Sequence, residues 1–115
     1  MGYRLPDAEA RAEKLDAALR HFVALLPRTD VQKVILFGSH ARGSLHSRSD
    51  LDLIVIRKTT QPFVRRADDL IDLFPPGTPV DLLVYTPEEW EQLRTGRDIH
   101  RRAHEEGVVI YDPGS

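Results

Sequence analysis

The chain has 115 residues, of which 41% are hydrophobic and 30% charged, and its formal net charge is −2. This composition fits one folded domain and excludes a disordered chain. The absence of cysteine excludes disulfides and thiolate metal sites. No apolar run reaches the ~20 residues that span a bilayer, and no signal-peptide core is seen. We therefore expect a cytoplasmic protein without membrane contact. Because the net charge is not positive, the sequence does not indicate a nucleic-acid-binding protein.

The first half of the chain predicts two helices and two strands. Apolar residues at three- and four-residue spacing predict a helix over 8–26, which Pro27 ends. A short apolar run predicts a strand over 32–37, followed by a short helix over 39–44. A second apolar run predicts a strand over 51–57.

The second half continues the alternation of helices and strands. The predicted elements are a helix over 63–74, a strand over 80–85, a helix from Pro87 to near Gly96, a last short helix between Asp98 and Gly107, and a strand over 108–111. Thr86 and Glu89 form a capping box with a proline just inside the helix. The order is that of an α/β domain, and the last strand is expected at an edge of the sheet.

A glycine–serine pair follows the first predicted strand. Gly38 lets the backbone approach a ligand closely, and Ser39 is a good N-cap that also offers a hydroxyl. The free N–H groups and the dipole of such a helix start attract anions. Arg42 and Arg48 lie nearby in sequence and could face phosphate oxygens. The segment is either a phosphate-binding turn or an ordinary strand-to-helix turn.

Two aspartates stand at the start of the 51–57 strand. Side chains on a strand alternate between faces, so Asp50 and Asp52 point the same way, roughly 7 Å apart. Leu51 and Leu53 then point into a core. Aspartate is depleted in strands. The pair is either a solvated strand end or a pair of hard oxygen ligands for Mg²⁺.

A third carboxylate lies near the start of the 80–85 strand. If this strand pairs beside 51–57, Asp81 can join Asp50 and Asp52. Three carboxylates on adjacent strands meet the requirement of a two-metal phosphoryl-transfer site, whose ions lie about 3.5–4 Å apart. Without cations, such a cluster would repel itself and lose solvation.

This pattern resembles the signature of the nucleotidyltransferase superfamily, which shares the polymerase-beta-like fold. The signature is Gly-Ser, ten residues and Asp-x-Asp, with a third carboxylate further on. The residues that match it or its usual flanks are Gly38, Ser39, Arg42, Ser49, Asp50, Asp52 and Asp81. The resemblance covers nearly the whole chain, so residues 1–115 are similar to a single minimal nucleotidyltransferase domain.

The resemblance implies a fold and a partner. The expected fold is α/β (α+β), a mixed twisted sheet of about four strands with helices packed mainly on one face. Members of the minimal group are commonly antitoxins, paired in a hetero-oligomer with a helical HEPN-domain toxin. The resemblance implies metal-dependent transfer of AMP from ATP to a residue of that toxin, often a tyrosine.

The hypothesis assigns a role to each matching residue. An acceptor hydroxyl attacks the α-phosphate of ATP bound with Mg²⁺, two ions being expected and Mn²⁺ a possible substitute. The expected nucleotide-binding residues are Gly38, Ser39, Arg42 and Ser49, and the expected catalytic and metal-binding residues are Asp50, Asp52 and Asp81. Asp81 is expected to bind the catalytic metal and to help take the acceptor proton.

Two other functions stay open. A non-catalytic module could neutralise a toxin by covering it, and a nucleotidyltransferase could act on a small molecule such as an aminoglycoside. The remaining conspicuous residues have structural interpretations. The basic pairs Arg65–Arg66 and Arg101–Arg102 are expected on solvated faces, although one of these pairs could meet an acidic partner. Tyr85, Trp90 and Tyr111 are expected to be packing residues.

Overall fold

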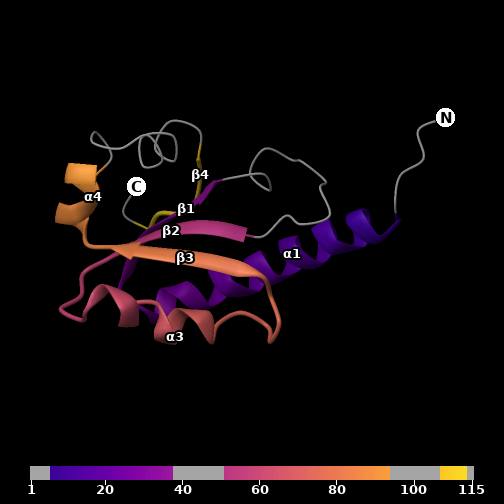
Figure 1. Ribbon diagram of the computed structural model, residues 1–115, viewed down its shortest axis with the longest axis horizontal. Coiled ribbons are helices and arrows are strands. Elements are labelled where there is room, and N and C mark those ends of the chain that lie inside the picture. The colour runs from indigo at the N-terminus through magenta and orange to yellow at the C-terminus, as the bar shows by residue number, and fades with distance from the viewer. Residues whose placement is uncertain (1–5, 38–50, 94–106, 114–115) are drawn as a thin grey trace.

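The computed structural model describes residues 6–37, 51–93 and 107–113 (Figure 1). The short helix expected over 39–44 and the last short helix expected before Gly107 lie outside these ranges. None of the helices in the described ranges is long and apolar enough to cross a membrane.

The described strands form one mixed sheet of four strands in the order β3-β2-β1-β4. The strands are β1 (Val31–Phe37), β2 (Leu51–Arg57), β3 (Val80–Tyr85) and β4 (Val108–Tyr111). β1 is antiparallel to both of its neighbours, and β2 and β3 are parallel. All four lie where the sequence predicts strands, with β4 at an edge, so the expected mixed four-stranded sheet is confirmed.

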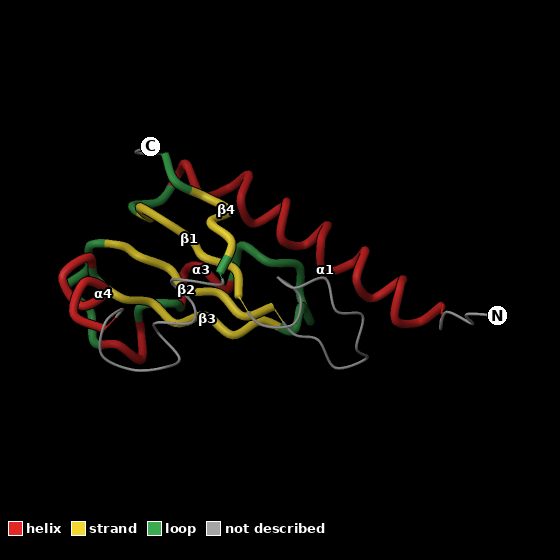
Figure 2. Tube along the Cα trace, turned by 90° about the horizontal axis from the view of Figure 1, so that it is seen from above, coloured by secondary structure: helices red, strands yellow, loops and turns green. Residues whose placement is uncertain are grey.

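One face of the sheet is covered by α1 (Pro6–Leu25) and the single-turn α3 (Asp68–Ile71), as Figures 1 and 2 show. The predicted apolar stripe of α1 faces the sheet and continues into the 3-10 turn η1 (Leu26–Arg28). The Phe22 ring is fully buried and stacks on Phe74, with ring centroids 4.3 Å apart. This is the larger of the two apolar cores, and the expectation of helices mainly on one face is confirmed.

The opposite face carries a smaller core under α4 (Pro87–Leu93). Trp90 of this helix is 6% exposed and packs with Ile54, Ile56 and Tyr85. The predicted capping box starts the helix: the Thr86 N–H donates to Glu89 Oε1 at 2.9 Å, and the Glu89 N–H donates to Thr86 Oγ1 at 3.2 Å. Trp90 is therefore a core residue, as expected.

The prediction of a continuous helix over 63–74 is wrong. The segment forms a 3-10 turn, η2 (Phe63–Arg65), and then the separate α3. The carbonyl of Arg66 accepts a hydrogen bond from the Arg57 side chain at 3.1 Å. The Leu70 N–H, which would bond to that carbonyl in a continuous helix, bonds one residue later at 3.0 Å. A tertiary contact thus replaces a helical hydrogen bond.

Candidate active site

Two carboxylates lie side by side at the start of the parallel strands. In the β2–β3 ladder, Asp52 is the Cα partner of Asp81, so the two residues lie on adjacent strands about 4.8 Å apart. Residues directly opposite one another share a face of the sheet. Asp52 is half-buried and Asp81 is exposed. The pairing that the sequence required for a shared site is present for these two carboxylates.

Their face is set by the alternation along the strands. Leu51 and Leu53 are fully buried under α1, so Asp52 between them points to the opposite face. The Leu51 N–H donates to the Pro79 carbonyl at 3.0 Å, which holds the two strand starts together. On the other side of β2, Phe37 at the end of β1 pairs with Asp52. The carboxylates are thus placed by three strands on a face that α1 does not cover.

The donor set suits a hard divalent cation. Carboxylate oxygens are the ligands that Mg²⁺ and Mn²⁺ prefer, and a cation between two adjacent carboxylates offsets their repulsion. Within the described ranges, no three His, Cys, Asp or Glu side chains gather into a metal-binding group. Asp52 and Asp81 are therefore two candidate ligands, and the third expected ligand, Asp50, lies outside those ranges.

The other predicted site residues also fall outside the described part of the chain. These residues are Gly38, Ser39, Arg42 and Ser49. Gly38 follows Phe37 directly in sequence, and Phe37 is the residue that pairs with Asp52. The roles of these residues in binding nucleotide stay predictions.

Comparison with known families decides the class of this protein. A family model described as polymerase beta, nucleotidyltransferase, matches residues 22–113. The chain belongs to this nucleotidyltransferase family. The match includes both β-strands that carry Asp52 and Asp81 and the whole segment that resembles the superfamily signature.

Known relatives of this nucleotidyltransferase are similar over most of their length. A Methanocaldococcus jannaschii protein with the provisional name protein adenylyltransferase is 29% identical over 99 residues, which are 84% of this chain and 97% of that protein. The fold matches a nucleotidyltransferase structure from Sulfolobus solfataricus with a TM-score of 0.59 and 19% identity, covering 98% of this chain and 93% of the other. It also matches a chain of a toxin–antitoxin complex solved with AMP-PNP, with a TM-score of 0.50, 22% identity and coverage of 90% and 74%.

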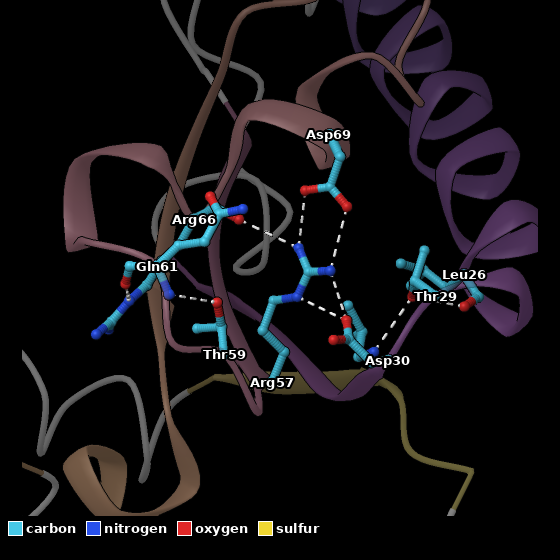
Figure 3. Close-up of polar contacts among 9 residues, drawn as sticks. Leu26, Thr29, Asp30, Arg57, Thr59, Gln61, Arg66 and Asp69 are labelled. Carbon is cyan, nitrogen blue, oxygen red and sulfur yellow. Dashed lines mark hydrogen bonds and ion pairs between the residues drawn. The ribbon is translucent and has the colours of Figure 1, made fainter.

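The nucleotidyltransferase carries an arginine network at the other end of the sheet, which sequence reasoning missed. Arg57, the last residue of β2, is 9% exposed. Its guanidinium donates to Asp30 Oδ1 at 2.8 Å and to the two carboxylate oxygens of Asp69 at 2.9 and 3.1 Å (Figure 3). Burial opposes the charge, but hydrogen bonds to Asp69 and Asp30 outweigh it and raise the pKa of Arg57. The hydrogen bond to Arg57 lowers the pKa of Asp69.

Arg66 is the second member of this network, and the prediction that it lies on a solvated face is wrong. Its side chain is 11% exposed. The guanidinium donates to both carboxylate oxygens of Glu89 at 2.6 and 3.2 Å, and to the Val84 carbonyl at 3.3 Å. The hydrogen bond to Arg66 lowers the pKa of Glu89. The neighbouring Arg65 is exposed, as predicted. A basic pair in the sequence carries no signal of which member finds a partner.

Proposed function

We propose that this nucleotidyltransferase transfers AMP from ATP to a hydroxyl of a HEPN-domain partner and thereby acts as an antitoxin. The observation that carries the proposal is the direct pairing of Asp52 with Asp81 on one face of the sheet. The name of the M. jannaschii relative supports protein as the acceptor class. The resemblance of the signature to minimal nucleotidyltransferases supports the HEPN partner, and the fold shared with the toxin–antitoxin chain is compatible with it.

The chemistry is an in-line displacement at phosphorus. The acceptor oxygen forms a bond to the α-phosphorus of ATP, and the bond from that phosphorus to the bridging oxygen of the β-phosphate breaks, so pyrophosphate leaves. The proton of the acceptor hydroxyl must go to a nearby base. Asp81 is assigned this role because it is the exposed member of the pair and can reach an incoming group.

The carboxylates are also assigned to the two cations that the reaction is expected to need. Their ligands would be Asp50, Asp52 and Asp81, and Mg²⁺ or Mn²⁺ would supply charge stabilisation on the triphosphate when bound. The backbone at Gly38 and Ser39 is assigned to the β- and γ-phosphates, and Arg42 and Ser49 to further contacts with the nucleotide. These last residues hold and orient the substrate, which contributes to rate by placing the α-phosphorus in line with the acceptor.

The test uses α-labelled ATP, Mg²⁺ and either the purified HEPN partner or a lysate of the source cells. The wild type is compared with Asp52→Asn and with Asp72→Asn, a matched change at an exposed carboxylate of the α3 end. We expect one labelled protein with the wild type and with Asp72→Asn, and none with Asp52→Asn. Label in a small-molecule fraction alone would place the acceptor in that class instead. No label in any fraction, with GTP, CTP and UTP also tried, would favour a non-catalytic binding module.

A further inference from the structure

We propose that Arg66 is a positioning residue, which sets the register of β3 and so keeps Asp81 beside Asp52. The two carboxylates are paired through the β2–β3 ladder. Arg66 lies near the opposite end of β3, where its side chain contacts the strand and the helix that follows it. The role in transfer rests on the proposed function, whereas the effect on register does not.

The strand β3 needs such a constraint because its own sequence specifies register weakly. Among the described strands, β3 is an edge strand that pairs with β2 alone. Apart from Asp81, every residue from Val80 to Tyr85 is apolar or aromatic, on both faces of the strand. A slip by one residue would exchange one apolar row for another and turn Asp81 to the α1 face. A slip by two would move Asp81 about 6.6 Å along the sheet.

Arg66 ties the far end of β3 at two points. Its Nη1 donates to the Val84 carbonyl at 3.3 Å, on the strand itself. Its two terminal nitrogens also donate hydrogen bonds to the carboxylate of Glu89 in α4, the helix that begins two residues after β3 ends. A planar, bidentate pair of this kind fixes orientation as well as distance. The contacts therefore resist sliding of β3 along β2.

Arg66 can act as an anchor because its own position is fixed. Its Nε donates to the Gln61 carbonyl at 3.0 Å. Its backbone carbonyl accepts a hydrogen bond from Arg57 Nη1 at 3.1 Å. Figure 3 shows the Arg57 guanidinium held between Asp30, which precedes β1, and Asp69 of α3. The chain of contacts thus runs from the start of β1 through the end of β2 to the end of β3.

The action on the carboxylates is indirect. Val84 lies three residues after Asp81, which corresponds to about 10 Å along a strand. Arg66 therefore acts through the strand, and its effect must show as a change in strand pairing and in cation binding at Asp52 and Asp81. A general loss of stability would show neither change while the protein remains folded.

The test compares Arg66→Lys and Glu89→Gln with Thr29→Ala. Lysine keeps the charge but cannot form the planar, bidentate pair with Glu89. Glutamine at position 89 can still complete the capping box. The control Thr29→Ala removes a hydroxyl that donates to the Leu26 carbonyl at 2.7 Å and accepts the Val31 N–H at 3.2 Å. This costs stability at the start of β1 without touching β3.

The first readout is amide hydrogen exchange by NMR, with cross-strand contacts between β2 and β3 recorded on the same samples. We expect Arg66→Lys to speed exchange in β3 at least tenfold relative to α1, and Glu89→Gln to do so less strongly. Thr29→Ala should leave that ratio unchanged. Equal ratios in Arg66→Lys and Thr29→Ala, or in Glu89→Gln and Thr29→Ala if the lysine variant does not fold, would overturn the proposal.

The second readout is the dissociation constant for Mn²⁺, measured by water proton relaxation on the folded proteins. We expect it to rise about fivefold in Arg66→Lys and to stay within twofold of the wild type in Thr29→Ala. An unchanged constant in Arg66→Lys would contradict the link to the carboxylates. A wild type that binds no Mn²⁺ and transfers no AMP would refute the proposed function, and the exchange ratio would still decide the register.

Discussion

The two ends of the β2–β3 pair use charge in opposite ways. At the strand starts, Asp52 and Asp81 place two like charges side by side. At the strand ends, Arg57 and Arg66 each lie between carboxylates and backbone carbonyls that complement their charge. Like charges directly opposite one another in a sheet destabilise it, whereas charge-assisted hydrogen bonds stabilise it. One end thus pairs opposite charges, and the other places like charges side by side.

This contrast separates a candidate functional site from a structural one. Two adjacent carboxylates repel one another, and a bound cation would offset that repulsion. Side chains that satisfy one another require nothing further. The lowered pKa values of Asp69 and Glu89 are explained by the arginines that pair with them and do not by themselves indicate a functional site.

The largest expected effect comes from breaking the carboxylate pair. Asp81→Asn should lower the rate of AMP transfer by at least about 100-fold, because it removes both an anionic ligand and the assigned base. The free energy of unfolding should stay the same or rise slightly, since one of two adjacent like charges is lost. Transfer assays and urea unfolding check the two parts. A variant that loses stability in proportion to activity would contradict the contrast between the two ends.

A substitution in the arginine network, at the opposite end of these strands, should instead lower stability. Arg57→Met should lower the free energy of unfolding by about 1–3 kcal/mol, because three charge-assisted contacts and one to the Arg66 carbonyl disappear. The cost stays below that of a fully buried pair, since the Asp30 and Asp69 side chains are 57% and 60% exposed and can be rehydrated. Urea unfolding measures the change. A loss of less than about 0.5 kcal/mol would show that the network adds little.

The same contrast explains what the sequence could predict. The strands follow from apolar runs, and the Asp52–Asp81 pairing follows once β2 and β3 are neighbours, because strand alternation and register are regular. The network could not be predicted. Arg57 ends an apolar run, and its partners lie 27 and 12 residues away, so only tertiary folding brings them together. The prediction of a continuous helix over 63–74 failed for the same reason, because the spacing of apolar residues cannot show that the Arg66 carbonyl accepts a hydrogen bond from a distant side chain.

A smaller effect is expected at the junction between β3 and α4. Thr86→Ala should lower the free energy of unfolding by about 1 kcal/mol, because the Glu89 N–H loses its hydroxyl acceptor. The pair between Glu89 and Arg66 should persist, as it uses the carboxylate and not the Thr86 hydroxyl. Urea unfolding checks the loss, and Thr86→Ser, which keeps a hydroxyl, is the matched control. Equal losses in the two variants would assign the effect to the methyl group.

The smallest expected effect is a loss of stability in acid, caused by the carboxylates that pair with Arg57 and Arg66. Hydrogen bonds to Arg57 and Arg66 lower the pKa values of Asp69 and Glu89 in the folded state. A carboxyl with a lowered pKa stabilises the fold at pH values above its unfolded pKa, about 4, and this contribution is lost as pH falls through the folded pKa. The free energy of unfolding should therefore decrease between about pH 5 and pH 2.

The size of this acid effect is limited by exposure. The Asp69 and Glu89 side chains are 60% and 42% exposed, so solvent screening should hold each contribution below about 1 kcal/mol. Urea unfolding at pH 6, 4 and 3 should show a shallower acid decline in Glu89→Gln than in the wild type, and the exposed Asp72→Asn serves as the matched control. If the free energy of unfolding falls as steeply with pH in Glu89→Gln as in Asp72→Asn, the acid sensitivity lies elsewhere. The ionised carboxylates of the arginine network would then not stabilise the sheet.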